Sequence, residues 1–438
     1  MRVLTKDILQ AAKQGDPEIT VQGWVHRVRE LGGISFVILR DRSGLGQLVF
    51  DEKPDLTLES VIKVQGIATL NEKAPGGAEV RVKTLVYLSK AAPDLPYQVN
   101  GDPAKVGLET ILDHRGLSVR HPRLQAIFRI QATIIEAFGA YLRSQDFIEI
   151  KTSKLVGSGT EGGTELFEVD YFDRKVYLAQ SPQFYKETMV ASGMERVFEI
   201  APAYRAEKHD TPRHLNEYVS LDVEMGFIES ELDLIELERG ALAYIFEEVA
   251  RKNSAELALH GASVPSPDMV VKAPVVPYEE AVKLASAEAV KGKGQTARIF
   301  DINPEAERFI CDWAMREHGS DLVFVNEFPR RYRPFYTYPK DTGDGKAAST
   351  MSFDALFRGL EITTGGRRQH DYNAFLETLP RFGLKPEGFG GYLKLLKYGC
   401  PPHGGFAIGC ERLTQKILGL ANIKEASLFP RDRKRVEP

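Results

Sequence analysis

Cysteine is scarce in this chain, whose 438 residues include only Cys311, Cys400 and Cys410. Such scattered cysteines cannot build a disulfide framework, and no set of Cys and His residues matches a zinc-binding spacing. Long apolar runs are also missing, and the first residues show neither an apolar core nor a small-residue cleavage site. These absences argue against a secreted, membrane-spanning or zinc-binding protein and favour a reducing compartment, the cytoplasm.

A large excess of charge is absent as well, because the formal net charge is −4 at pH 7 and the pI is about 6.2. The whole molecule therefore does not attract nucleic acid, and any such contact must use a local basic patch. One candidate patch lies in residues 21–44. It combines aromatic rings, which can stack on bases, with guanidinium groups, which can hold phosphate. The patch comprises Trp24, Phe36, Arg27, Arg29, Arg40 and Arg42.

The length and the 43% share of hydrophobic residues allow about two or three domains with buried cores. Residues 19–90 contain five short β segments separated by Gly, Asp and Pro turns, which predicts a small barrel. Residues 91–120 are rich in Pro, Gly and Asp and have little periodicity. We therefore expect a barrel domain at 1–95, a hinge at 96–120 and a second domain at 121–438.

The second domain lacks regular β-α-β alternation, so an antiparallel sheet flanked by helices is expected, in an α+β fold. Long helices are predicted at 124–145 and 231–252. Strands are predicted at 175–180, 196–207, 218–228 and 354–364. The first helix carries an apolar stripe of the kind that forms a core or a dimer contact. This stripe comprises Ile127, Ile130, Ile134, Ile135, Phe138 and Leu142.

Residues 157–162, GSGTEG, match the G-x-G-x-x-G pattern of dinucleotide-binding sites. That fingerprint requires its third glycine to open a helix, whereas the residues that follow favour strand and turn. A glycine-rich loop is the better interpretation.

Three distant segments place unusual polar residues on otherwise apolar strands. Arg205 and Glu207 would share one face of a strand, because side chains alternate along it. Taken singly, these residues could be surface ion pairs, solvated carboxylates or tightly packed glycines. Their coincidence in one chain indicates one site. The polar residues are Arg205, Glu207, His214, Glu217 and Tyr218 in 204–218; Asp354, Glu361 and Arg368 in 354–370; and Glu411 and Arg412 in 403–413.

These segments resemble motifs of the class II aminoacyl-tRNA synthetases. YRAE at 204–207 resembles motif 2 of that family, and GGFAIGCERL at 404–413 resembles motif 3. The chain most resembles aspartyl-tRNA synthetases of the archaeal type, which some bacteria also carry. One departure is Ser153, where motif 1 usually has a proline at the dimer contact. Other matching stretches are EGGTELF, LAQSPQFYK, EIAPAYRAE, RHLNE, YGCPPHGGFAIG and LFPRDRKR.

The resemblance implies an OB-fold anticodon-binding barrel, a class II catalytic domain and a homodimer. The reaction would attach L-aspartate to tRNA through an aspartyl-adenylate, with ATP and Mg²⁺. Arg205 would hold the α-phosphate, and Tyr218 and Arg412 would sandwich the adenine ring, which Glu207 also contacts. Catalysis would use Arg205, Glu207, His214 and Arg412. ATP would bind Arg205, Glu207, His214, Tyr218, Glu361 and Arg412, and Mg²⁺ would bind Asp354, Glu361 and Thr364.

For the amino acid, the resemblance implies that Glu161, Gln183 and Asp222 meet the α-ammonium group. Lys186 and Arg368 would meet the side-chain carboxylate. An amide in its place would leave both cations buried without a counter-charge, which would exclude asparagine. Because Glu161 lies in the glycine-rich loop, that loop becomes a lid over the substrate.

For tRNA, the resemblance implies that Phe36 stacks on an anticodon base and Gln47 reads a base edge. Relatives that charge only tRNA-Asp tend to carry tryptophan and lysine at the positions of His26 and Pro75. A smaller imidazole and a proline would tolerate both U and C as the third anticodon base. The expected partners are therefore tRNA-Asp and tRNA-Asn, with an amidotransferase needed downstream. Alternatively, Phe36 is barrel core, His26 caps a strand and Pro75 stiffens a turn.

Other functions fit part of the chain. They are an aspartyl-tRNA synthetase that charges only tRNA-Asp, an asparaginyl-tRNA synthetase, a tRNA-independent amidating relative, and a tRNA-binding module with a degenerate catalytic domain. Lys186 with Arg368 argues against the asparaginyl enzyme, and the barrel argues against the amidating relative. The presence of a complete set of motif residues argues against a degenerate domain. That set comprises Arg205, Glu361 and Arg412.

Overall fold

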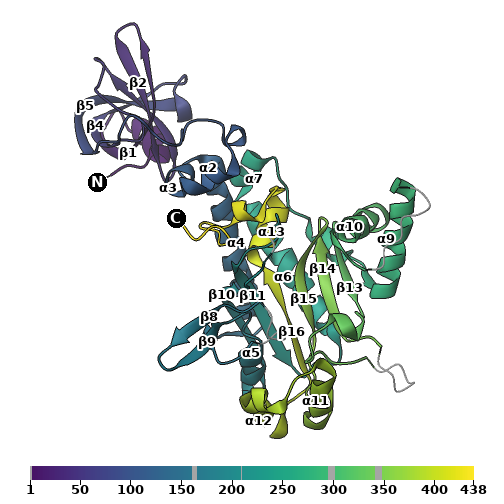
Figure 1. The fold of residues 1–438 in the computed structure, drawn as a ribbon. Coiled ribbons are helices and arrows are strands. Elements are labelled where there is room, and N and C mark those ends of the chain that lie inside the picture. Colours follow the sequence, from purple (N-terminus) through teal and green to yellow (C-terminus); the bar gives the residue numbers. More distant parts are fainter. Residues whose placement is uncertain (1, 160–164, 209, 294–300, 341–347) are drawn as a thin grey trace. The chain divides into compact units, whose positions relative to one another are not determined.

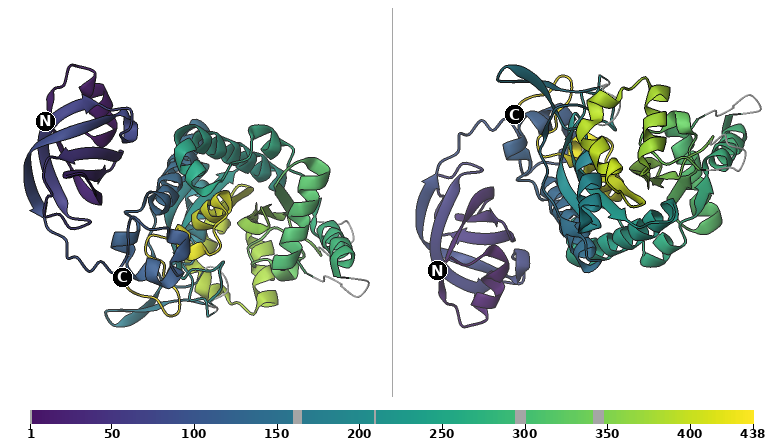
Figure 2. Two further views of the ribbon diagram at one scale, coloured as in Figure 1. Left: turned by 90° about the horizontal axis from the view of Figure 1, so that it is seen from above. Right: turned by 90° about the horizontal axis from the view of Figure 1, so that it is seen from below.

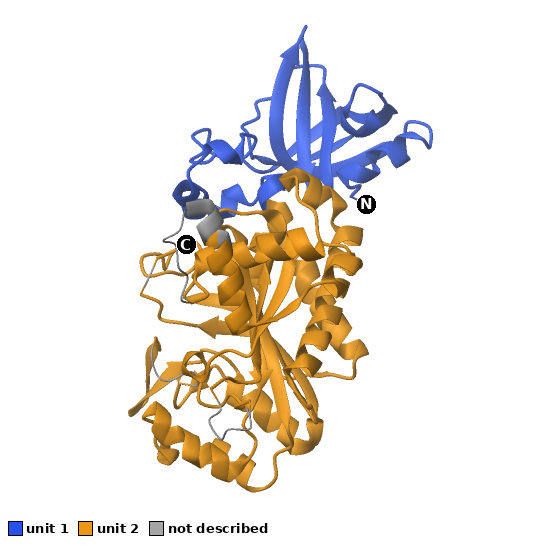
Figure 3. Ribbon diagram, turned by 90° about the vertical axis from the view of Figure 1, so that its right-hand side faces the viewer, with its two compact units in different colours: residues 1–124 blue, residues 125–438 orange. Residues whose placement is uncertain are grey.

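A computed structural model describes residues 2–159, 165–208, 210–293, 301–340 and 348–438, and Figures 1 and 2 show the fold. The chain forms two compact units, residues 1–124 and 125–438, which Figure 3 distinguishes by colour. The first unit includes the segment predicted as a hinge, whose limits at residues 96 and 120 stay a prediction. That segment forms the short helices η3 (Pro103–Lys105), α2 (Leu108–Asp113) and α3 (Arg115–Ser118).

The first unit is built on a closed barrel with the strand order β1-β2-β3-β5-β4, which confirms the predicted five-stranded barrel. Side chains alternate between the core and the outer face, so Val37 and Leu39 of β2 are fully buried. The strands are β1 (Glu18–Leu31), β2 (Ile34–Asp41), β3 (Gly44–Phe50), β4 (Val61–Leu70) and β5 (Ala78–Ser89). The helices are η1 (Thr5–Asp7), α1 (Ile8–Ala12) and η2 (Pro75–Gly77).

The second unit contains an eight-stranded sheet with the order β12-β13-β14-β15-β16-β11-β10-β6 (Figure 1). Its strands are β6 (Ile148–Glu149), β10 (Arg196–Tyr204), β11 (Glu217–Gly226), β12 (Val275–Pro277), β13 (Leu322–Asn326), β14 (Ser352–Phe357), β15 (Leu360–Arg367) and β16 (His403–Gly409). The pairs from β13 to β10 are all antiparallel, which confirms the predicted antiparallel sheet flanked by helices. The sheet is mixed only at its two edges, where β6 runs parallel to β10 and β12 to β13. A smaller sheet comprises β7 (Leu155–Val156), β8 (Glu168–Tyr171) and β9 (Arg174–Leu178).

Helices flank the large sheet (Figure 2), and both predicted long helices are present as α4 and α6. Helix α4 (Pro122–Ser144) begins at the end of the first unit and continues into the second. The other helices of the second unit are α5 (Gln183–Met189), η4 (Val190–Met194), α6 (Glu231–Lys252), α7 (Ser254–His260), α8 (Pro267–Val271), α9 (Tyr278–Lys293), α10 (Pro304–His318), η5 (Arg330–Tyr332), α11 (Tyr372–Thr378), η6 (Leu379–Phe382), η7 (Pro386–Phe389), α12 (Gly390–Lys397), α13 (Cys410–Leu418) and η8 (Ile423–Ala426). Among the helices described, none is both long and apolar enough to cross a membrane.

The apolar stripe of α4 belongs to the core. Phe138 packs edge-on against Phe198 of β10, with ring centroids 6.0 Å apart. Five stripe residues are fully buried in the single chain, so they are not available for a dimer contact. These five are Ile127, Ile130, Ile134, Phe138 and Leu142.

Residues 354–364 form a hairpin and not the single strand that was predicted. Strand β14 turns at Arg358 and Gly359 into β15, and both turn residues have positive φ, 49° and 76°. Positive φ at both central residues matches the twist of a tight hairpin. The register pairs Asp354 with Thr364, and a bulge then shifts the pairing so that Glu361 lies opposite Leu356. The turn therefore brings Asp354, Glu361 and Thr364 together.

Strand β16 lies between β15 and β11 and depends on glycine for its close approach. Gly405 pairs with Glu224 of β11, and a Cβ added to Gly405 would lie 2.0 Å from the Val223 carbonyl oxygen and 2.3 Å from Glu224 Oε2. A Cβ added to Gly409 of the same strand would meet only side-chain atoms of Arg412, at 3.5 Å or more. A side chain would therefore collide with neighbouring atoms at Gly405 but not at Gly409.

We expect Gly405→Ala to lower the free energy of unfolding by roughly 1–3 kcal/mol, the usual cost of overpacking a core. Thermal unfolding would measure the loss as a lower Tm. Gly409→Ala is the matched control and should unfold near the wild-type temperature. Equal stability of the two variants would contradict the close packing described for Gly405.

Candidate active site

A cavity of about 430 Å³ opens on one face of the eight-stranded sheet. Alternate residues of β11 form its floor, since Tyr218, Ser220 and Asp222 line it and Glu224 continues the same face. The intervening Leu221 is fully buried and belongs to the opposite face. Along β11 the polar side chains become progressively more buried, from half-buried Tyr218 to fully buried Glu224.

The register continues this face across the sheet. Asp222 pairs with Ala407 of β16, Ala407 with Thr364 of β15, and Thr364 with Asp354 of β14. Neighbouring strands lie about 4.8 Å apart, so Asp222 and Asp354 are separated by roughly 14 Å. The cavity therefore has two ends, one at Asp222 and one at the β14–β15 hairpin.

Most of the residues predicted for aspartate and ATP converge on this cavity. Asp354 is not among the lining residues, and Glu161 lies outside the described residues, so the predicted lid over the substrate stays a prediction. The predicted residues that line the cavity are Gln183, Lys186, Asp222 and Arg368, together with Arg205, Glu207, His214, Tyr218, Glu361, Thr364 and Arg412.

A buried cluster of charges forms the Asp222 end. Lys186 Nζ lies 3.0 Å from Asp222 Oδ1 and 3.3 Å from Glu224 Oε2, and it also donates to the Val223 carbonyl at 3.2 Å. Arg368 donates from Nε and Nη2 to the two oxygens of Glu224 at 3.0 and 3.2 Å. We expected from the sequence that bound asparagine would leave both cations without a counter-charge, and this expectation is therefore wrong. Glu224, which supplies one, was missed, although the alternation of β11 could have revealed it.

Two groups in this cluster retain hydrogen-bonding capacity. Arg368 Nη1 makes no hydrogen bond to any residue that the structure describes, and Arg368 lines the cavity. Asp222 Oδ2 likewise has no hydrogen-bond partner within the described parts of the chain. A guanidinium nitrogen only donates and a carboxylate oxygen only accepts. This end can therefore bind a ligand that carries both a carboxylate and an ammonium group.

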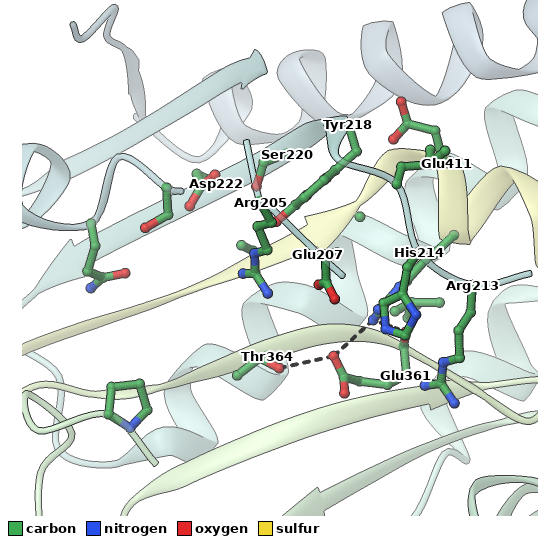
Figure 4. Close-up of a pocket in the computed structure, with 18 of the residues that line it drawn as sticks. Arg205, Glu207, Arg213, His214, Tyr218, Ser220, Asp222, Glu361, Thr364 and Glu411 are labelled. Atoms are coloured by element: carbon green, nitrogen blue, oxygen red, sulfur yellow. Dashed lines mark hydrogen bonds and ion pairs between the residues drawn. The ribbon is translucent and has the colours of Figure 1, made fainter. Parts of the chain in front are cut away.

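Arg205 occupies the middle of the cavity. The predicted strand at 196–207 ends at Tyr204, so Arg205 and Glu207 extend from the following loop and still line the cavity. Figure 4 shows Arg205 between Asp222 on one side and His214 and Glu361 on the other. His214 Nδ1 lies 2.6 Å from the Thr211 hydroxyl.

The hairpin end gathers two carboxylates and several guanidinium groups. Arg412 Nη1 donates to Glu361 Oε1 at 3.1 Å. Thr364 donates to the same oxygen at 3.3 Å, as Figure 4 shows. Partial burial opposes ionisation of Glu361, but Arg412 and other nearby guanidinium groups hold its pKa below the usual range. Arg333, which sequence reasoning missed, pairs with Asp354 at 2.8 Å.

The oxygen atoms at this end fit a hard divalent cation such as Mg²⁺. Burial and the nearby charge of Glu361 raise the pKa of Asp354 to about 7 even though Arg333 opposes the shift. A cation near these carboxylates would relieve their repulsion. In the part of the chain that the structure describes, no three His, Cys, Asp or Glu side chains are grouped to hold a metal alone. Mg²⁺ usually keeps water and substrate phosphate among its ligands, so a sparse protein set suffices.

Glu411 has a structural position. It is buried at the start of α13 and accepts the Val219 backbone N–H at 3.1 and 3.0 Å. Burial raises the pKa of Glu411 to about 7. Its contact ties α13 to β11, and Glu411 is itself among the residues that line the cavity.

The outer face of the barrel presents the predicted anticodon residues. Phe36 lies opposite Arg29, and Ile38 of the same strand lies between Arg27 and Gln47. Directly opposed residues share one face of a sheet, so Phe36 and Gln47 lie on the same face. Phe36 is half-buried and lies outside the cluster that fills the barrel core, which argues against the core alternative.

Gln47 is tied to the loop between β4 and β5. Its Nε2 and Asn71 Nδ2 both donate to Glu79 Oε2, at 2.9 and 2.7 Å. Asn71 and Glu79 flank this loop, in which Pro75 is exposed. The side chain of Gln47 and the loop that carries Pro75 are therefore neighbours.

His26 occupies a bulge in β1. The register passes from Val25 opposite Leu39 to Arg27 opposite Ile38, so His26 has no partner residue on β2. Strand β1 continues to Leu31, and the alternative that His26 caps the strand is wrong.

The imidazole of His26 is oriented by a buried ion pair. Its Nδ1 lies 3.1 Å from Arg40 Nη1, and Arg40 also binds Glu59 at 2.9 and 2.6 Å. Burial and the charge of Arg40 lower the pKa of His26. Because arginine only donates, Nδ1 accepts and the neutral ring carries its proton on Nε2.

Comparisons with known proteins agree with this architecture. A model described as OB-fold nucleic acid binding domain matches residues 19–88. The chain is 46% identical to an aspartate–tRNA(Asp/Asn) ligase of Thermus thermophilus over the whole of both chains. It is 40% identical to an aspartate–tRNA(Asp) ligase of Pyrococcus horikoshii, over 96% of each chain.

A solved structure is similar over its full length. Asparaginyl-tRNA synthetase from Pyrococcus horikoshii, complexed with asparaginyl-adenylate, has a TM-score of 0.89, 28% identity and complete coverage of both chains. The model for tRNA synthetases class II (D, K and N) matches residues 107–433, which include every residue that lines the cavity. This chain therefore belongs to the class II tRNA synthetases of the D, K and N family.

Proposed function

We propose that this protein attaches L-aspartate to tRNA in an ATP-dependent reaction that passes through aspartyl-adenylate, and that it charges both tRNA-Asp and tRNA-Asn. The observation that carries the amino-acid assignment is the buried cluster of Lys186, Asp222, Glu224 and Arg368. Its remaining donor and acceptor, Arg368 Nη1 and Asp222 Oδ2, suit the side-chain carboxylate and the α-ammonium group of aspartate. An asparagine amide could offer only its carbonyl oxygen to this guanidinium, and it would lack the negative charge and the second acceptor oxygen of a carboxylate.

The central position of Arg205 supports its role at the α-phosphate. In the first step, an α-carboxylate oxygen of aspartate attacks this phosphorus, and pyrophosphate leaves with the bonding electron pair. The reacting phosphate must therefore lie between the amino acid and the rest of ATP. Charge develops on its oxygens, and a permanently charged guanidinium can stabilise it without proton transfer.

The hairpin end suits the remaining phosphates. Class II tRNA synthetases use ATP, and we assign its β- and γ-phosphates to the neighbourhood of His214 and Arg412. Asp354, Glu361 and Thr364 would hold Mg²⁺, which when bound neutralises phosphate charge. We assign the adenine ring to the space between Tyr218 and Arg412, with Glu207 at its amino group.

The second step transfers the aspartyl group to the terminal ribose hydroxyl of tRNA and releases AMP. We assign the anticodon to the outer face of the barrel, where Phe36 can stack on a base and Gln47 can reach a base edge. Specificity for both tRNAs is supported by His26 and Pro75, which present no bulky indole and no cation to the third anticodon base. The 46% identity to a tRNA(Asp/Asn) ligase also supports it.

Further parts of the proposal concern the cell and the assembly. Asp-tRNA-Asn would require an amidotransferase to become Asn-tRNA-Asn, and the reaction belongs in the cytoplasm. We also propose a homodimer. Strand β6 forms one edge of the large sheet, and Ile148 on it exposes 49% of its surface, which supports a contact with a second copy there.

Arg368→Lys should weaken aspartate activation. Lysine keeps the positive charge beside Glu224 but removes the Nη1 donors, and a hydrogen bond to a charged group is worth about 1.5–3 kcal/mol. We expect the KM for aspartate in ATP–pyrophosphate exchange to rise about tenfold or more, while the KM for ATP stays near the wild-type value.

Arg367→Lys is the matched control for this experiment. The neighbouring Arg367 donates to the Glu229 carbonyl at 2.8 Å and does not line the cavity. Its variant should activate aspartate normally. If Arg368→Lys also activated aspartate normally, the carboxylate assignment would be wrong.

Substitution of both His26→Trp and Pro75→Lys should select against tRNA-Asn. The wild type should charge transcripts of both tRNAs, and the double variant should lose charging of tRNA-Asn about tenfold more than charging of tRNA-Asp, the order of one base-edge contact. The measurement is kcat/KM for each transcript with labelled aspartate. If the wild type did not charge tRNA-Asn, the proposed dual specificity would be wrong, whereas the proposed activation of aspartate would still stand.

A further inference from the structure

A buried hydrogen-bond network surrounds Glu187, beside the amino-acid end of the cavity. Glu187 is fully buried and follows Lys186 on α5. Its Oε2 accepts from the Tyr392 hydroxyl and lies 2.9 Å from His403 Nε2. Its Oε1 accepts from Gln183 Nε2 at 2.7 Å. Gln183 and Glu187 are four residues apart, so they share one face of the helix.

The charge of Glu187 determines which atoms can face it. Burial opposes ionisation, but the hydrogen bond and the charge of His403 hold the pKa of Glu187 below its usual range. The pKa of His403 is raised well above its usual value despite burial, by hydrogen bonds to Cys400 and Glu187. An ionised carboxylate has no proton to donate. Gln183 must therefore direct its amide nitrogen toward Glu187.

This orientation determines what Gln183 offers to the cavity. The nitrogen and oxygen of a carboxamide lie in one plane and point in different directions from the same carbon, so holding the nitrogen against Glu187 turns the carbonyl oxygen away from it. Gln183 lines the cavity together with Lys186 and Asp222. Its carbonyl oxygen and the unpartnered Asp222 Oδ2 are both acceptors, as an ammonium group requires. A reversed amide would point N–H groups at the ammonium.

We infer that Glu187 is a positioning residue that holds the Gln183 amide in the orientation that presents its carbonyl oxygen to the α-ammonium group of bound aspartate. The inference rests on the proposed function, because it takes aspartate as the ligand. Glu187 acts through Gln183 and does not touch the substrate.

The test compares aspartate with succinate, which is aspartate without its α-amino group. Glu187→Gln lets the Gln183 amide adopt either orientation. The KM for aspartate in ATP–pyrophosphate exchange should rise about tenfold, the lower range for a charged hydrogen bond, while kcat changes less. The inhibition constant of succinate and the KM for ATP should stay near wild-type values. The ratio of the succinate constant to the aspartate KM should therefore fall about tenfold.

Tyr392→Phe is the matched control. It removes one hydrogen bond to the other oxygen of Glu187 and leaves the contact with Gln183 intact, so the ratio should not change. The exchange of the two side chains, Gln183→Glu with Glu187→Gln, keeps one carboxylate and one amide in the pair. This double variant should restore the ratio of the succinate constant to the aspartate KM to the wild-type value or above. It also tests the inference if Glu187→Gln alone does not fold.

The outcomes separate the two hypotheses. A Glu187→Gln variant that weakens aspartate and succinate equally would overturn the inference, because the residue would then only support the pocket. The inference would also be overturned if the double variant, Gln183→Glu with Glu187→Gln, showed a ratio of the succinate constant to the aspartate KM equal to or lower than that of Glu187→Gln alone. Absence of aspartate-dependent exchange in the wild type would instead overturn the proposed function, and the inference with it.

Discussion

The charge balance beneath the cavity is the constraint on which the rest of the site depends. Lys186 and Arg368 are 2% and 6% exposed, and a buried charge without a partner costs several kcal/mol. Asp222 and Glu224 balance these cations from neighbouring positions of one strand face. Because the four charges balance each other, the site can retain one donor and one acceptor for a ligand that itself carries both signs.

Backbone geometry makes room for this cluster. Gly405 lets the carboxylate of Glu224 lie against β16, where any side chain would collide with it. The tight turn at Arg358 and Gly359 folds one polar segment back on itself, and the bulge that follows turns Glu361 toward Thr364. The hydrogen-bonded pairing of the strands therefore sets the distance between the two ends of the cavity.

In the barrel, too, a buried and paired carboxylate orients a side chain at the surface. Glu59 is buried and receives hydrogen bonds from Arg40 and Arg120, whose guanidinium groups lie 5.8 and 5.6 Å from the ring of Trp24. Arg40 in turn orients His26. A paired buried carboxylate thus fixes the side chain on which tRNA selection is proposed to depend, as Glu187 is inferred to do for Gln183.

The sequence by itself determined the barrel and the long helices, because period-two strands and helical stripes are local patterns. Most of the residues that converge on the cavity were recognised through the resemblance of short segments to class II motifs, which are also local. The sequence could not reveal the partners. Glu224 is 144 residues from Arg368 in the sequence, and Arg333 lies in the loop after η5, so only tertiary packing brings each to its counter-charge. The hairpin at 358–359 and the bulge at His26 were also missed, because one turn or one extra residue hardly changes an apolar pattern. Tertiary structure decided which charges are already neutralised and which atoms remain for a ligand, since that depends on distances between strands that no local pattern contains.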